Sequence, residues 1–109
     1  MPKSYVRERA EPRLPMQLPV NVSGHGLVPG VERTFTRDVS ARGACVVSAR
    51  RWDPGDRLLL ASSPGDFYAV ARVAYCRSIP GEGFRVGLEF LEPSGQWVVP
   101  PSESIHAAV

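Results

Sequence analysis

Short runs in which apolar and polar residues alternate follow one another along most of the chain. The most regular is residues 84–90, where four apolar side chains alternate with Arg85, Gly87 and Glu89. Because successive side chains of a strand point to opposite faces, this run predicts a half-buried β-strand. Similar runs predict further strands at residues 14–22, 31–39, 43–48, 57–61 and 67–75.

The same alternation predicts which side chains face the core. In the first run the apolar face consists of Leu14, Met16, Leu18, Val20 and Val22. The prolines on its other face indicate an irregular, edge-like beginning. In the second run Phe35 is the expected aromatic anchor, and in residues 67–75 Tyr75 falls on the same face as Ala69, Ala71 and Val73.

These strands predict an all-β chain. About six strands are separated by Pro-Gly turn signals, at residues 54–55 and 80–81, and no amphipathic helix of ten residues is evident. A single helical turn around residues 94–97 is expected to plug one end. Closing the sheet into a small six-stranded antiparallel β-barrel would remove its exposed edges.

The expected domain organisation is a flexible N-terminal arm at residues 1–13, a barrel at residues 14–99 and a frayed tail at residues 100–109. A length of 109 residues, 43% of them hydrophobic, suits one globular domain. The net charge of +2 is too small for a protein that coats nucleic acid. No apolar run approaches the ~20 residues of a membrane helix, and no signal peptide is evident, so a cytoplasmic location without membrane insertion is predicted.

Few residues suggest chemistry of the catalytic or metal-binding kind. Cys45 and Cys76 lie in apolar runs and are expected to be buried free thiols rather than a disulfide. His25 and His106 are far apart and have no cysteine at ligand spacing, so no metal site is expected. Without a Ser-His-Asp set or a pair of acids on one face, the sequence indicates a binding protein and not an enzyme.

The stretch that suggests binding is Asp38-Val39-Ser40-Ala41-Arg42-Gly43. Asp38 and Ser40 are two residues apart on an extended chain, so both point to the same side. Gly43 marks a tight turn or the close approach of another group. Upstream, Arg9 and Arg13 could fold over this rim to bind an anion that also carries amide-like donors, such as a guanine nucleotide.

Each feature also has a simpler interpretation. The box could be a hairpin turn in which Asp38 and Ser40 hydrogen-bond to their own backbone. The basic arm, which carries Lys3 and three arginines, could be a solvated terminus. The arginine pair and the box occurring together favour a binding site over both of these.

Arg-x-x-x-Arg (residues 9–13) followed by Asp-x-Ser-x-x-Gly (residues 38–43) in a small all-β chain resembles the PilZ domain. Residues 14–20 and 85–90 support the resemblance, which extends from about Arg7 to Trp97. It implies a six-stranded antiparallel barrel that binds cyclic di-GMP, without any other cofactor. The implied ligand-binding residues are Arg9, Arg13, Asp38, Ser40 and Gly43.

The resemblance also implies a mechanism. Ligand binding would order the arm and offer a new surface to a protein partner, for example in motility, pilus or exopolysaccharide machinery. Glu8 stands where relatives that hold two stacked ligands carry an arginine, which favours one ligand per chain. The alternatives are a nucleotide-independent PilZ-like adaptor in pilus or flagellar machinery and, less favoured, a barrel that binds single-stranded nucleic acid.

Overall fold

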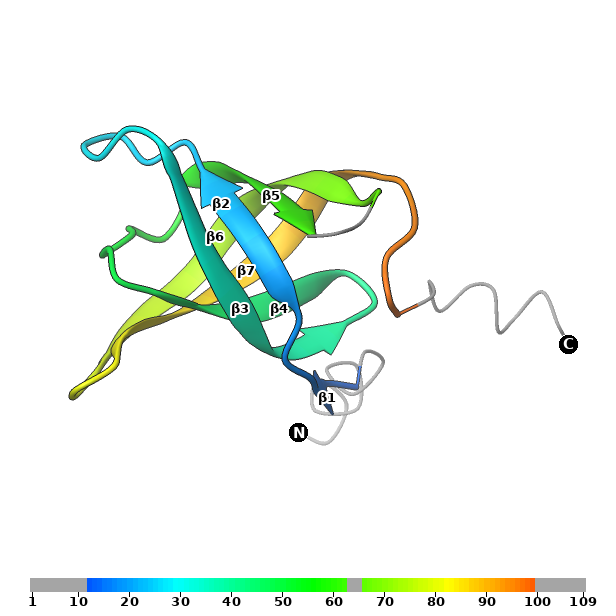
Figure 1. Cartoon of the computed structure of the whole chain (residues 1–109), viewed down its shortest axis with the longest axis horizontal. Coiled ribbons are helices and arrows are strands. Elements are labelled where there is room, and N and C mark those ends of the chain that lie inside the picture. The colour runs from blue at the N-terminus through cyan, green and yellow to red at the C-terminus, as the bar shows by residue number, and fades with distance from the viewer. Residues whose placement is uncertain (1–11, 63–65, 100–109) are drawn as a thin grey trace, which may run out of the picture.

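A computed structural model describes residues 12–62 and 66–99, which form seven β-strands and contain no helix (Figure 1). Every strand pairing is antiparallel. The strands are β1 (Leu14–Pro15), β2 (Pro19–Ser23), β3 (Val31–Ser40), β4 (Gly43–Ser48), β5 (Arg57–Ser62), β6 (Tyr68–Ile79) and β7 (Gly83–Ser94). The prediction of an all-β chain is therefore confirmed.

The sheet closes on itself into a barrel. Its order is β1-β3-β2-β5-β6-β7-β4, and a further pairing between β3 and β4 joins the two ends. Six strands make the closed barrel, as predicted, and the short β1 is an additional strand alongside β3 (Figure 1). Of the predicted arm only residues 12 and 13 are described, and the predicted tail lies outside the described residues.

The core fills the inside of the barrel with side chains from β2 and β4–β7. The run at residues 84–90 behaves as predicted, because Val86 and Leu88 are buried while Phe84 and Phe90 pack against the core. The buried cluster consists of Val20, Val22, Val46, Trp52, Leu58, Leu60, Phe67, Ala69, Ala71, Val73, Val86 and Leu88. Because these side chains occupy the interior, a ligand site has to lie on the outside or at the ends of the barrel.

The first predicted strand is interrupted. Val20 and Val22 are buried as expected, but the side chains of Leu14 and Met16 are exposed by 43% and 36%. Between β1 and β2 the Thr36 hydroxyl donates to the Met16 carbonyl at 2.7 Å and accepts from the Leu18 amide at 2.9 Å. The prediction of one continuous buried face was wrong because a side chain replaces the regular ladder there.

Two further details differ from the prediction. Phe35 does not anchor the core; it is 40% exposed, and its neighbour Thr36 is the fully buried residue. The helical turn around residues 94–97 does not form, because β7 continues to Ser94 and Gly95 then adopts φ +90°. Both cysteines are free thiols, with Cys45 buried and Cys76 half-buried. The described residues include no helix long and apolar enough to cross a membrane.

Candidate functional site

A cavity of about 260 Å³ lies on the outer face of the barrel, where β4, β6 and β7 meet the end of β3. Its walls include Ser40 and Gly43 from the predicted box and Arg13 from the predicted arginine pair. Asp38 adjoins it through an ion pair with Arg13. Four of the five predicted residues are therefore brought together, and the fifth, Arg9, lies outside the described residues.

Arg13 reaches Asp38 because of the short strand β1. Leu14 pairs with Val39 and Pro15 with Asp38, which places the residue before β1 next to the end of β3. The Arg13 Nη1 donates to the Asp38 Oδ1 at 2.6 Å across 25 residues of sequence. The side chains are 48% and 31% exposed, so the pair contributes only ~0.2–1 kcal/mol to stability.

A β-bulge in β3 aims Asp38 at the outer face. Thr36 pairs with Val46, but the next pairing joins Asp38 to Cys45, so Arg37 is an extra residue opposite a single step of β4. Thr36 points inward and is fully buried. With strict alternation Asp38 would also point inward; the bulge turns it outward instead.

A second bulge, in β6, does the same for Tyr75. Val73 pairs with Leu88 and Tyr75 with Gly87, so Ala74 is the extra residue. Val73 and Leu88 belong to the core, and Tyr75 therefore lies on the opposite face with Gly87. The sequence prediction, which placed Tyr75 on the core face, was wrong for this reason.

The two bulges align Asp38, Cys45, Gly87 and Tyr75 as register partners across β3, β4, β7 and β6. The Tyr75 ring lies across Gly87, where a Cβ atom would come within 2.2 Å of its Cε2. The ring thereby reaches Cys45, to which it is hydrogen-bonded. We call Cys45, Gly87 and Tyr75 the floor; Gly87 and Tyr75 line the cavity, and Cys45 adjoins it through its hydrogen bond with Tyr75.

The floor is electrically neutral at ordinary pH. Burial raises the pKa of the Cys45 thiol, an effect that the hydrogen bond from Tyr75 partly offsets. Burial also raises the pKa of the Tyr75 phenol, and the hydrogen bond to Cys45 raises it further. These directions fit a phenol that donates to the sulfur. The guanidinium of Arg77 lies over the Tyr75 ring, 5.4 Å from its centroid, and adds a cation beside the floor.

Gly43 permits β4 and β7 to approach closely. A Cβ atom on Gly43 would lie 2.2 Å from the carbonyl oxygen of Leu88. Its φ is not in the left-handed region, unlike that of six other glycines. Both roles expected for Gly43 are found, because Gly43 also closes the tight turn at residues 41–42, where it pairs with Ser40.

The sequence missed Tyr75, Arg42 and Glu89 among the residues that line the cavity. Arg42 and Glu89 could have been suspected, since one lies inside the box and the other in the most regular strand. No signal identified Tyr75, because its outward direction depends on a bulge. The arrangement as a whole, with cationic guanidiniums, the carboxylates of Asp38 and Glu89 and a neutral aromatic floor, suits an anion that also carries hydrogen-bond donors.

No curated protein sequence matches the chain significantly. A protein-family model described as the PilZ domain matches residues 7–96, which include both motifs and all seven strands. PilZ domains are binding and adaptor domains, and the family is known for binding cyclic di-GMP and protein partners. The match covers most of the chain, and the barrel agrees with it. The chain therefore belongs to the PilZ domain family.

Proposed function

We propose that this chain is a cyclic di-GMP receptor and that the ligand binds at the cavity beside Arg13 and Asp38. The observation that carries the proposal is the 2.6 Å ion pair between these residues, which joins the arginine motif to the Asp-x-Ser-x-x-Gly box. It lies at a cavity of about 260 Å³ that Ser40 and Gly43 also line. Two residues 25 apart in sequence, one from each motif, thus share one surface.

Each residue has a role that its chemistry supports. The Arg13 guanidinium is a planar fork that can bind a phosphodiester or the O6 and N7 acceptors of guanine. The Asp38 carboxylate can accept from the guanine N1–H and the 2-amino group, and the Ser40 hydroxyl can add a hydrogen bond. Arg9, in the segment that precedes Arg13, is proposed as the second guanidinium.

The ion pair between Arg13 and Asp38 is weak enough for the ligand to replace. Breaking an exposed pair of this kind costs ~0.2–1 kcal/mol. A charge-assisted hydrogen bond contributes ~1.5–3 kcal/mol, so each group gains by exchanging its partner for a phosphate or a guanine edge. The pair keeps both side chains near the cavity before the ligand arrives, which reduces the entropy lost on binding.

Binding is proposed to change the N-terminal arm and so signal to a protein partner. Arg9 lies in the arm at residues 1–13, and its capture by the ligand would draw that segment toward the barrel. Glu8 opposes a second anionic ligand, which supports a stoichiometry of one. The expected result is slower amide hydrogen exchange in residues 5–15 on ligand addition. Unchanged exchange at saturation would exclude the arm as the responsive element.

Isothermal titration calorimetry with cyclic di-GMP tests the binding proposal. We expect a dissociation constant in the micromolar range or tighter, weakened ~10- to 100-fold in Arg9→Ala and in Arg13→Ala. Arg57→Ala is the matched control, because it removes the same charge from β5, which contributes nothing to the cavity. Binding that is unaffected in both test variants would refute the site. No binding by the unmodified chain would refute the function and favour the nucleotide-independent adaptor.

A further inference from the structure

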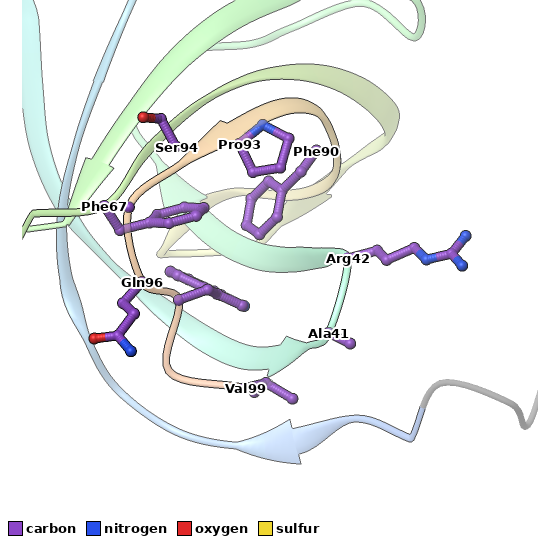
Figure 2. A pocket seen from close by; sticks show the side chains of 10 residues that line it. Ala41, Arg42, Phe67, Phe90, Pro93, Ser94, Gln96 and Val99 are labelled. Atoms are coloured by element: carbon purple, nitrogen blue, oxygen red, sulfur yellow. The ribbon is translucent and has the colours of Figure 1, made fainter. Parts of the chain in front are cut away.

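A second cavity, of about 480 Å³, lies at one end of the barrel, and three aromatic side chains line it. Figure 2 shows Phe67 and Phe90 pointing into it from different segments, whereas the guanidinium of Arg42 points away. The Trp97 ring completes the cluster, with its centroid 4.6 Å from that of Phe67 and 4.9 Å from that of Phe90. We call this the aromatic cavity.

Two hydrogen bonds join the aromatic cavity to the ligand-binding box. The indole Nε1 of Trp97 donates to the carbonyl oxygen of Ser40 at 2.8 Å. The backbone amide of Phe90 donates to the carbonyl oxygen of Arg42 at 2.8 Å. Ser40 is buried and lines the first cavity, so it contacts both sites.

Trp97 is held firmly enough to act on Ser40. Gly95 has φ +90°, and a Cβ atom there would lie 1.8 Å from the carbonyl oxygen of Asp66, so the segment after β7 is folded closely against residues 66–67. The two phenylalanine rings then fix the plane of the indole. With the indole packed at 39° to the Phe67 ring and edge-on to the Phe90 ring, its N–H donates to the Ser40 carbonyl oxygen.

We infer that Trp97 is a positioning residue. It holds residues 40–42 of the box in their binding geometry and couples the cavity beside Arg13 to the segment after β7, residues 95–99. A ligand that moves Ser40 changes the length of the hydrogen bond to Trp97, and the aromatic cavity changes with it. By linkage, a molecule bound in the aromatic cavity would change the affinity for the ligand by the same factor by which the ligand changes the affinity for that molecule. The coupling to ligand rests on the proposed function, but the positioning of the box does not.

Amide hydrogen exchange in the unliganded protein tests the positioning. Trp97→Phe keeps an aromatic ring in the aromatic cavity and removes the N–H donor. Losing one hydrogen bond of ~1 kcal/mol should speed exchange at residues 41–43 about fivefold. Trp52→Phe is the matched control: it also removes an indole N–H, which donates to the Ser48 hydroxyl at 3.2 Å, but neither Trp52 nor Ser48 lines either cavity, so exchange at residues 41–43 should change less than about twofold.

Ligand titrations separate the coupling from stability. Trp97→Phe should weaken cyclic di-GMP binding about fivefold, whereas Trp52→Phe should leave the affinity nearly unchanged because Trp52 lines neither cavity. In a Trp52→Phe background the fluorescence of Trp97 should respond to the ligand. If Trp97→Phe does not fold, the hydrogen bond is measured in the Trp52→Phe protein instead, where the Trp97 indole N–H should exchange slowly.

The outcomes are distinguishable. Equal exchange at residues 41–43 in Trp97→Phe and the unmodified protein, or rapid exchange of the indole N–H, overturns the positioning role. Calorimetric binding without any fluorescence response or affinity change overturns the coupling. If the unmodified chain does not bind cyclic di-GMP, the proposed function fails, while the exchange measurement still decides whether Trp97 positions the box.

Discussion

Replacing Gly43 with alanine should destabilise the barrel, because the added methyl group has no space. Gly43 is the first residue of β4 and pairs with Glu89 of β7. Its Cβ would lie 2.2 Å from the carbonyl oxygen of Leu88, and a backbone atom in a paired strand cannot move aside as a side chain can. The two strands would have to separate locally at the cavity beside Arg13, which Gly43, Leu88 and Glu89 line.

The expected magnitude follows from three terms. Forcing a methyl group into a packed site costs ~1–3 kcal/mol. Separating the strands weakens at least one ladder hydrogen bond, worth ~1 kcal/mol. Alanine also lowers the entropy of the unfolded chain, which stabilises by ~0.4–1 kcal/mol. The net loss is about 2 kcal/mol in the free energy of unfolding, or ~10 °C in melting temperature for a domain of this size.

Urea denaturation followed by tryptophan fluorescence measures the change. Gly26→Ala is the matched control, since nothing lies within 4 Å of its Cβ position and its φ is not in the left-handed region. It should alter stability by less than ~0.5 kcal/mol. A Gly43→Ala protein as stable as Gly26→Ala would refute the close approach as the reason for glycine at this position.

Three further predictions concern the floor and the ion pair. The folded-state pKa of the Cys45 thiol is raised above its ordinary value of 9.0. The stability that the protonated thiol contributes is therefore complete below pH 9 and is lost as the pH rises further. Cys45→Ala should accordingly flatten the decline in melting temperature above pH 9. Gly87→Ala should displace the Tyr75 ring and speed alkylation of Cys45 by iodoacetamide, and an unchanged rate would contradict the floor geometry. Arg13→Ala should lower the free energy of unfolding by less than ~1 kcal/mol in urea titrations; a larger loss would show that the pair with Asp38 is structural.

The sequence predicted the strands well because burial on one face leaves a period of two in the residue types. The run at residues 84–90 and the strand at residues 43–48 are found where alternation and β-branching placed them. The same rule failed at Phe35 and Tyr75. A β-bulge adds one residue to one strand, so the faces on its two sides are reversed relative to each other. Phe35, before the bulge in β3, is exposed although Val39 beyond it is buried, and Tyr75 lies beyond the bulge in β6. No residue type reliably marks the position of a bulge.

The residues of the candidate site could be predicted from the sequence, but the strand pairing that brings them together could not. Spacing alone indicated that Asp38 and Ser40 share a face, and the sequence favoured Arg9 and Arg13 as their partners. It did not reveal that β1 pairs with the end of β3, which is what places Arg13 beside Asp38. Pairing between segments distant in sequence depends on the closed barrel, and local patterns carry little information about it.

The two bulges also explain how a small barrel can present a candidate binding site. Its interior is filled by core side chains, so functional groups have to be displayed on the outside of strands whose alternation also has to satisfy the core. One extra residue at Arg37 and one at Ala74 let β3 and β6 keep their buried residues on one side of the bulge and present Asp38 and Tyr75 beyond it. Each bulge gives up regular ladder pairing, and that local loss is offset by a core that remains intact on either side. The site is therefore built by departures from the regular pattern that defines the fold.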